Sequence, residues 1–536
     1  MKKARGKRTM KKMVYFFLLW IFFVFLNCGV LDPLNSRIAV AGEISKKISK
    51  ESPQTTPQKE KGKEFPSEKL SATYHSMEIN GQTLRYTATA GYLPVKDEAG
   101  KLKGNLFFVA YTRNPGDDPH RPVTFAFNGG PGASSIWLHL GALGPQRVPM
   151  TDAGEVSTPP YRPVPNEFTW LEFTDLVFID PIGTGYSRPA PGVDPKGFYG
   201  VEKDIQSVGE FIRLYLTRYN RWRSPKFLAG ESYGTTRAAG LAGYLQDRFG
   251  LDLNGVILIS AVLNFQTLVF QPGNDLPYLL YLPPYTAAAF YHQKLSPDLQ
   301  SDLRKTLHSA EQWAMNEYLP ALAKGDSLPN EERKKVIDQL AGYTGLSRDY
   351  VRESKLRVSN VRFAKELLRR EGRTIGILDS RYKGIDRDSA GEFPDFDPSI
   401  QNTVGPYVGV LMDYLRKDLQ WETDLPYEYL SEKANESWNW GSARKGYLDV
   451  GETLRRAMSK NRRLEVFIAN GLYDLDTSYF ATRYTIHHLG LDPGLRKNIT
   501  LSYYEAGHQM YVHPPSLKKL RAEVAEFMKD AVPVKR

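Results

Sequence analysis

The sequence predicts an α/β fold in which a mostly parallel central sheet carries an inserted, mainly helical cap. Short apolar segments typical of buried strands recur along the chain, with helical stretches between them. Strands of this kind that alternate with helices indicate a parallel sheet covered on both faces. Between residues 267 and 445 no strand series continues, and long segments have a helical period instead. A cap over the ends of the strands would lie where such sheets bind ligands.

The chain begins with a predicted export segment. Seven Lys and Arg residues precede Met13, the apolar run MVYFFLLWIFFVFL extends from Met13 to Leu26, and AVA stands at Ala39–Ala41. This arrangement is typical of a secretory signal that is removed after about Ala41. If the apolar run is instead retained, it forms a single anchoring helix. Residues 1–41 are therefore either a signal peptide or an N-terminal anchor.

Charge and cysteine content narrow the classes of function. The net charge is +11, and removal of residues 1–41 takes away eight Lys or Arg and one Asp, which leaves +4. This near balance removes the main support for a nucleic-acid partner. Cys28 is the only cysteine, and Asn27 before it makes a lipoprotein site the less favoured alternative. A processed chain has no disulfide and no cysteine-based zinc site, and the nine histidines show no HExxH spacing.

The remaining chain divides into four predicted parts. Residues 42–70 are polar, punctuated by proline and mixed in charge, which predicts a flexible linker. Residues 71–266 form the first part of the catalytic domain, residues 267–445 the cap, and residues 446–536 the second part of the catalytic domain. The strand-like segments of the two catalytic parts are LRYTATAGYL, NLFFVAYT, VTFAF, DLVFID, KFLAG, GVILIS, EVFIANG and ITLSYYEAG.

A serine lies at a predicted sharp turn between a strand and a helix. Ser232 is the central residue of GESYG, which follows the strand-like Lys226–Gly230 and precedes a helical stretch. In this G-x-S-x-G setting the neighbours are small, so the hydroxyl projects above the sheet at a helix N-terminus. The alternative is an ordinary turn serine. The position after a buried strand favours Ser232 as the nucleophile.

A serine hydroxyl is a weak nucleophile and requires a base, which in turn requires a residue that orients it. ANGLYDLDTS and YEAGHQMY each follow a predicted strand and place Asp474 and His508 in loops. The chain order Ser, Asp, His is the one used by sheets with this serine turn. Asp474 is favoured over Asp476, which is then a turn or capping residue. His508 is favoured over the histidines that lack a strand-glycine-loop position, namely His487, His488 and His513.

A glycine-rich loop is the predicted oxyanion hole. FNGGPGASS, Phe127–Ser135, follows the strand VTFAF, and its glycines let the backbone approach a substrate closely. We assign the two donors to the backbone N–H groups of Gly130 and of Tyr233, which follows the serine. Taken alone, the loop is equally a structural turn. Its combination with the serine turn favours the oxyanion hole.

NGGPGASS, GESYG, NGLYD and AGHQMY, in this order, resemble the motifs of the serine carboxypeptidase family. The likeness spans about residues 75–515 and includes NEFTWLEFTDLVFIDPIGTGYS, which is similar to another segment of that family. The resemblance implies an α/β-hydrolase fold with a mostly parallel central sheet and an inserted mainly helical cap. It also implies that Ser232, Asp474 and His508 are catalytic.

The resemblance further implies how the substrate's C-terminal carboxylate is bound. Asn128 opens NGGPG and Glu231 precedes the serine, and the family's residues at these positions hold the carboxylate. The family has a second glutamate fourteen residues after that asparagine, where GALGP places Ala142. Two carboxyl groups held together keep one of them protonated, so that it can donate to a carboxylate, and this chain lacks that pair. Arg147 is a candidate for compensating charge, although a structural or surface arginine is the favoured alternative.

The expected function is hydrolysis of peptide bonds at substrate C-termini through an acyl-enzyme on Ser232, with no metal and no organic cofactor. The alternative is an esterase or acyltransferase, because the triad does not choose between amides and esters. A third reading is a non-catalytic binding protein that keeps the fold. The expected partners are peptide or protein C-termini, with no nucleic acid, and a membrane only if the N-terminal segment is retained. The expected location is periplasmic or extracellular, whereas side-chain preference and oligomeric state stay open.

Overall fold

The computed structural model describes residues 69–536, apart from residues 116–117, 119, 157, 442–445 and 533–536. The predicted signal or anchor at 1–41 and nearly all of the predicted linker at 42–70 lie outside the described residues. Within the described part, no helix is both long enough and apolar enough to span a bilayer.

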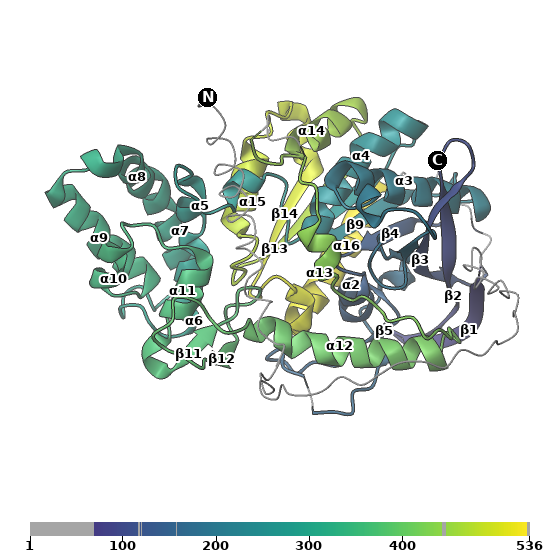
Figure 1. Cartoon of the computed structure of the whole chain (residues 1–536), viewed down its shortest axis with the longest axis horizontal. Helices are drawn as coiled ribbons and strands as arrows, with labels where there is room; N and C mark the ends of the chain where they lie inside the picture. Colours follow the sequence, from purple (N-terminus) through teal and green to yellow (C-terminus); the bar gives the residue numbers. More distant parts are fainter. Residues whose placement is uncertain (1–68, 116–117, 119, 157, 442–445, 533–536) are drawn as a thin grey trace, which may run out of the picture. The chain divides into compact units, whose positions relative to one another are not determined.

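A ten-stranded sheet forms the centre of the described chain (Figure 1). Its strands are β1 (Leu70–Ile79), β2 (Gln82–Lys96), β3 (Leu102–Arg113), β4 (Val123–Phe127), β7 (Asp175–Ile179), β8 (Arg188–Pro189), β9 (Lys226–Glu231), β10 (Gly255–Ile259), β13 (Glu465–Gly471) and β14 (Ile499–Tyr504). They lie in the order β1-β2-β3-β7-β4-β9-β10-β13-β14, with β8 beside β3. The pairs from β7 to β14 are all parallel, and the pairs among β1, β2, β3 and β7 are antiparallel. The sheet is thus mostly parallel and its connections contain helices, which confirms the predicted fold class.

Helices cover both faces of the sheet, and successive strand residues alternate between two hydrophobic cores. Ala126 and Phe178 belong to one core, whereas their neighbours Phe125 and Val177 belong to the other. This alternation explains why the strands are apolar throughout. The first core includes α2 (Ile136–Leu138), α12 (Pro398–Lys417) and α16 (Pro514–Ala531), and the second includes α3 (Val201–Arg218), α4 (Tyr233–Phe249) and α14 (Gly451–Lys460).

The chain between β10 and β13 contains the range predicted as the cap, residues 267–445. Its elements are α5 (Leu276–Leu280), α6 (Leu282–Tyr291), α7 (Leu303–Trp313), α8 (Leu319–Lys324), α9 (Asn330–Thr344), α10 (Arg348–Glu353), α11 (Asn360–Glu366), β11 (Arg373–Ile375), β12 (Lys383–Ile385), α12 and α13 (Glu432–Glu436). Helix α12 packs Tyr407, Val410 and Leu411 into the first core of the sheet. The insertion therefore contributes to the core of the central sheet, and its boundary as a separate cap stays a prediction.

Candidate active site

Ser232 lies at a sharp turn between β9 and α4. Its backbone has φ 60° and ψ −130°, a conformation that L-residues rarely adopt. Strand β9 ends at Glu231 and α4 begins at Tyr233, so a single residue reverses the chain direction. The Ser232 N–H donates to the Ile259 carbonyl oxygen at 3.0 Å, which fixes the turn against the end of β10. The strained backbone is thus held by the neighbouring strand.

Asp474 and His508 meet in the loops that follow β13 and β14. Asp474 Oδ2 lies 2.8 Å from His508 Nδ1, and both side chains are buried. The Thr477 hydroxyl donates to the same carboxylate oxygen at 2.6 Å, and the backbone N–H groups of Asp476 and Thr477 donate to Oδ1 at 2.8 Å each. Asp476 Oδ2 is 4.0 Å from the same ring nitrogen, and a third of its side chain is exposed. The geometry therefore favours Asp474 as the residue that orients the imidazole.

The His508 loop is joined to the end of β10, beside Ser232. The Ser260 hydroxyl donates to the His508 carbonyl oxygen at 2.6 Å, and Ser260 directly follows the residue that holds the Ser232 N–H. Among the described residues, no hydrogen bond joins the Ser232 hydroxyl to the His508 ring. Catalytic hydrogen bonds are often long before substrate binds. The structure thus holds the His508 loop beside the Ser232 turn, without a hydrogen bond between the two side chains.

Buried carboxylates set the charge of His508. Burial lowers the pKa of His508, but the nearby carboxylates, with Asp474 foremost, outweigh it and raise the pKa to about 9. Glu231 is one of these carboxylates. Protonation of Glu231 removes one of the charges that favour the imidazolium, so neutral His508 becomes easier to form.

Backbone contacts position the predicted oxyanion loop. A Cβ atom at Gly129 would lie 2.4 Å from the Tyr233 nitrogen, so only glycine lets the loop approach the start of α4 this closely. Gly130 is the next residue, and the predicted donors therefore belong to segments that touch. The Arg237 guanidinium donates to the Asn128 carbonyl oxygen at 2.7 Å and to buried Asp204 at 2.7 Å. At the far end of the loop, the Ser135 N–H donates to Asp180 at 2.8 Å.

Glu231 is buried and hydrogen-bonded to a tyrosine. The Tyr511 hydroxyl donates to Glu231 Oε2 at 2.6 Å. Burial raises the pKa of Glu231 to about 7, and the positive charge of His508 and hydrogen bonds from Tyr511 and Asn128 counteract part of that rise. The Asn128 side chain also accepts from the Leu138 N–H at 3.0 Å. The two residues predicted to bind the substrate carboxylate therefore lie together, and Glu231 is close enough to His508 for each to affect the charge of the other.

Ala142 and Arg147 occupy different environments. Ala142 is fully buried, and its carbonyl oxygen accepts from Asn166 at 3.0 Å. Arg147 makes two hydrogen bonds with the Glu167 carboxylate, at 3.0 and 3.1 Å. This pairing neutralises Arg147 locally, so the geometry favours the structural reading over a role in binding a substrate carboxylate.

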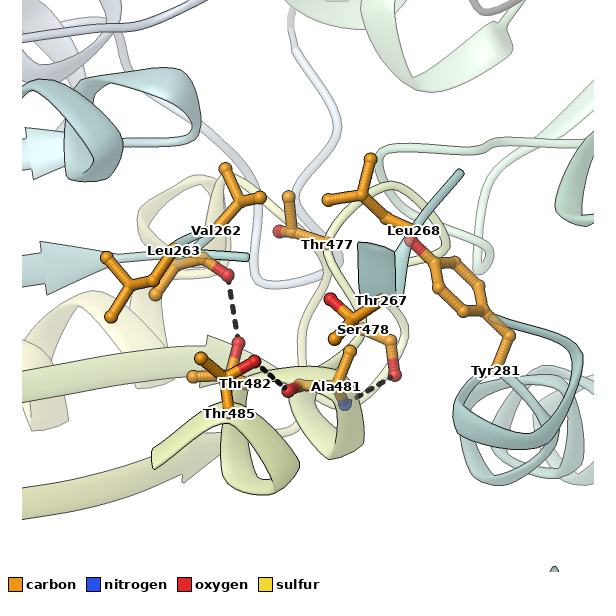
Figure 2. Close-up of a pocket in the computed structure, with 11 residues that line it drawn as sticks. Val262, Leu263, Thr267, Leu268, Tyr281, Thr477, Ser478, Ala481, Thr482 and Thr485 are labelled. Carbon is orange, nitrogen blue, oxygen red and sulfur yellow. Dashed lines mark hydrogen bonds between the residues drawn. The ribbon is translucent and has the colours of Figure 1, made fainter. Parts of the chain in front are cut away.

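A small pocket adjoins the loop that carries Asp474 (Figure 2). It lies between the chain after β10, the helix α5 region and the start of α15 (Tyr479–His487). Thr477 points into it and also contacts the Asp474–His508 pair. The Thr482 hydroxyl donates to the Ala261 carbonyl oxygen at 2.9 Å and holds α15 against the end of β10. The lining includes no carboxylate, amine or imidazole, so a substrate carboxylate would have no charged partner there.

Three supporting residues were not singled out by the sequence analysis. Thr477, Ser260 and Tyr511 each hold a predicted site residue through a side-chain hydroxyl. Thr477 lies in the ANGLYDLDTS segment, and Tyr511 follows His508 by three residues. Closeness in sequence to a predicted site residue was therefore the available signal. Nothing in the sequence around Ser260 marks it. In the part of the chain that the structure describes, no cluster of three or more His, Cys, Asp or Glu could hold a metal ion.

A family model described as serine carboxypeptidase matches residues 79–361. The match includes Asn128, Glu231 and Ser232 and ends before Asp474 and His508. A pheromone-processing carboxypeptidase KEX1 of Metarhizium robertsii is 31% identical over 164 residues, which are 29% of this chain and 24% of that protein. Serine carboxypeptidase-like 33 of Arabidopsis thaliana is 29% identical over 164 residues, which are 30% of this chain and 31% of that protein. The chain thus matches about a quarter to a third of the length of these relatives.

The solved structures that this chain resembles are distant from it. A proline iminopeptidase of Mycobacterium smegmatis is 12% identical with a TM-score of 0.34, covering 82% of this chain and 98% of that one. A lipase in its open form is 14% identical with a TM-score of 0.34, covering 82% of this chain and 98% of that one. At these TM-scores the likeness says nothing of activity.

Proposed function

We propose, because this chain belongs to the serine carboxypeptidase family, that it is a serine-type carboxypeptidase that hydrolyses peptide bonds at substrate C-termini. The observation that carries the proposal is the buried 2.8 Å contact between His508 and Asp474, joined through Ser260 to the strand end that holds Ser232. Peptide or protein C-termini are the proposed substrates.

The proposed reaction proceeds through an acyl-enzyme. The neutral form of His508 removes the proton of the Ser232 hydroxyl as the oxygen attacks the carbonyl carbon, and Asp474 stabilises the imidazolium that forms. The N–H groups of Gly130 and Tyr233 donate to the oxyanion. The tetrahedral intermediate collapses, the peptide bond breaks, and His508 gives the proton to the departing amine. Water, deprotonated by His508, then attacks the ester and releases Ser232.

Recognition of a free C-terminus is assigned to Glu231 and Asn128. A neutral Glu231 can donate a hydrogen bond to the terminal carboxylate, whereas an ionised Glu231 repels it. Burial supports the neutral form, because it raises the pKa of Glu231 to about 7. A buried carboxyl group beside the nucleophile, neutral below about pH 7, distinguishes this proposal from a general esterase.

Replacement of Glu231 by glutamine is expected to remove the pH dependence of free-acid recognition. In the native protein, the ratio of kcat/KM for a free-acid peptide to that for its amide is expected to fall about tenfold per pH unit above pH 7, because the protonated fraction falls at that rate. In Glu231→Gln the neutral amide donates at every pH, so the ratio should stay constant. Stopped assays of matched peptides between pH 5 and 9 measure both. If Glu231→Gln changes kcat/KM of the two peptides equally at each pH, Glu231 does not have this role.

Replacement of Tyr511 by phenylalanine is expected to move the fall of the free-acid to amide ratio to higher pH. The Tyr511 hydroxyl stabilises the ionised form of Glu231, so its removal raises the pKa of Glu231 further. A hydrogen bond to a charged group contributes about 1.5–3 kcal/mol, which corresponds to a shift of about one to two pH units. The free-acid to amide ratio measured against pH reports the shift. If the ratio depends on pH in this variant as it does in the native protein, Tyr511 does not act on Glu231.

We also propose export of the chain through residues 1–41, to the periplasm or the extracellular space. The support is the basic start, the apolar run and the AVA sequence at Ala39–Ala41. N-terminal sequencing of protein recovered from the host's exported fraction tests it: a new terminus after about Ala41 indicates cleavage, and an intact terminus in the membrane fraction indicates anchoring.

A further inference from the structure

A segment of the insertion touches both loops that carry the proposed base and acid. This segment, residues 377–381, connects β11 to β12 and is called here the clamp. The His508 N–H donates to the Leu378 carbonyl oxygen at 2.6 Å, and the Leu475 N–H donates to the Ile377 carbonyl oxygen at 2.9 Å. Consecutive clamp carbonyls thus hold one residue from each loop.

Side chains of the clamp add a second set of contacts. The Gly507 N–H donates to Asp379 Oδ2 at 3.0 Å, and the Ser380 hydroxyl donates to the Tyr473 carbonyl oxygen at 2.9 Å. Gly507 directly precedes His508, and Tyr473 directly precedes Asp474. A Cβ atom at Gly507 would lie 2.4 Å from the Asp379 Cβ atom, so glycine is needed for the clamp to approach.

Asp379 is itself held in place by a buried charge. The Arg381 guanidinium donates to Asp379 Oδ1 at 2.9 Å and to Oδ2 at 2.6 Å, and it donates to the Glu505 carbonyl oxygen at 3.2 Å. Asp379 is only 4% exposed. Because a bidentate arginine pair fixes the plane of a carboxylate, Oδ2 keeps a fixed direction toward the His508 loop.

The clamp is anchored to the main body of the insertion. The Asp397 carboxylate, which caps α12, accepts from the N–H groups of Ile377 and Leu378 at 3.1 and 3.2 Å. Helix α12 packs into the core of the sheet. The clamp is therefore hydrogen-bonded to the N-terminal cap of a helix that packs into the core of the sheet.

We propose that the clamp sets the separation between the Asp474 and His508 loops, and that Asp379 is a positioning residue for the proposed reaction. The inference rests on the proposed function for its kinetic consequence. Strands β13 and β14 are parallel neighbours, and their loops share a hydrogen bond from the Tyr473 N–H to the Ala506 carbonyl oxygen at 3.1 Å. Beyond that bond, the clamp adds its own contacts to Leu475, Gly507 and His508. Loss of Asp379 releases Gly507, so the imidazole moves relative to Asp474 while the residues assigned to the substrate carboxylate keep their contacts.

Asp379→Ala is the first test, with Asp386→Ala as its matched control. Asp386 forms a buried ion pair with Lys365 in the same insertion and has no hydrogen bond to either loop among the described residues. Asp379→Ala is expected to lower kcat about a hundredfold with little change in KM, because a displacement of about 1 Å in a catalytic group has that effect. Asp386→Ala should lower the melting temperature while kcat, measured well below it, stays near the native value.

Asp379→Asn tests the same proposal if the alanine variant does not fold. Asparagine retains the size of the side chain and one acceptor oxygen, so a loss of about fivefold in kcat is expected, equivalent to about one hydrogen bond. The downfield NMR signal of the proton between His508 Nδ1 and Asp474 should shift or broaden in either Asp379 variant and stay unchanged in Asp386→Ala. A folded Asp379→Asn protein with native kcat and a native proton signal would overturn the proposal.

The NMR signal separates this inference from the proposed function. The signal depends on the Asp474–His508 contact and requires no substrate. If the protein hydrolyses no peptide but the signal responds to Asp379, the clamp stands and the proposed function fails. If hydrolysis depends on Ser232 but the signal is unchanged in the Asp379 variants, the proposed function stands and the proposed role of the clamp is wrong.

Discussion

Replacement of Ser232 by alanine is expected to lower kcat for peptide hydrolysis by about a millionfold. The hydroxyl is the atom that forms the acyl-enzyme, and no other residue at the turn can replace it. Its removal should leave the fold intact, because among the described residues the Ser232 side chain makes no hydrogen bond and its backbone bonds to Ile259 and Thr235 remain. Steady-state assays on a free-acid peptide and the melting temperature measure the two effects.

Ser347→Ala is the control for that experiment. Ser347 caps α10 through a hydrogen bond to the Tyr350 N–H at 3.1 Å, so its loss costs about 1 kcal/mol of stability. Native activity in this variant would show that removing a serine is harmless in itself. A serine-reactive phosphonate should label the native protein and the control but not Ser232→Ala. Turnover by Ser232→Ala in a clean preparation would exclude Ser232 as the nucleophile.

Replacement of Asp474 by asparagine is expected to lower kcat about ten-thousandfold. The carboxylate accepts from His508 Nδ1 and keeps Nε2 free to take the serine proton. An amide NH2 group in the same place donates to Nδ1 instead, which favours the wrong tautomer. Asp474 also accepts from Thr477 and from two backbone N–H groups, so the asparagine side chain stays in position and the loss comes from chemistry.

Asp476→Asn is the matched variant two residues along the same loop. The Asp476 carboxylate is 4.0 Å from the ring nitrogen and a third exposed, so its removal should lower kcat by no more than about fivefold. A comparison of kcat for the two variants on one peptide assigns the acid. Equal losses, or a larger loss at Asp476, would reverse the assignment.

The sequence predicted the sheet because buried parallel strands leave a local signal. Segments such as Val123–Phe127 and Gly255–Ile259 are apolar at every position, since each face of the sheet is covered. The packing of α12 was harder to predict. An amphipathic helix has an apolar face whatever it packs against, so nothing in Pro398–Lys417 showed that Tyr407 lies in the core of the sheet.

The candidate site shows the same limit. Ser232, Asp474 and His508 follow strands and sit in recognisable loops, and the structure brings these loops together. The clamp carries no comparable signal, because the Ile377 and Leu378 contacts are made by backbone carbonyls, which every residue has. The Tyr511 hydroxyl is likewise an ordinary tyrosine in the sequence. Its contact with Glu231 depends on how the chain after His508 folds back, which local spacing does not determine.

Arg237 ties the oxyanion loop to the helix that begins at the nucleophile. Its guanidinium binds the Asn128 carbonyl and the buried Asp204 carboxylate, and it lies over the rings of Phe127 and Tyr233. Separating the loop from the helix would leave a charge buried without its partners, which is far costlier than a frayed surface turn. The two segments are therefore held together in the folded domain, so the predicted oxyanion donors are in place before a substrate binds.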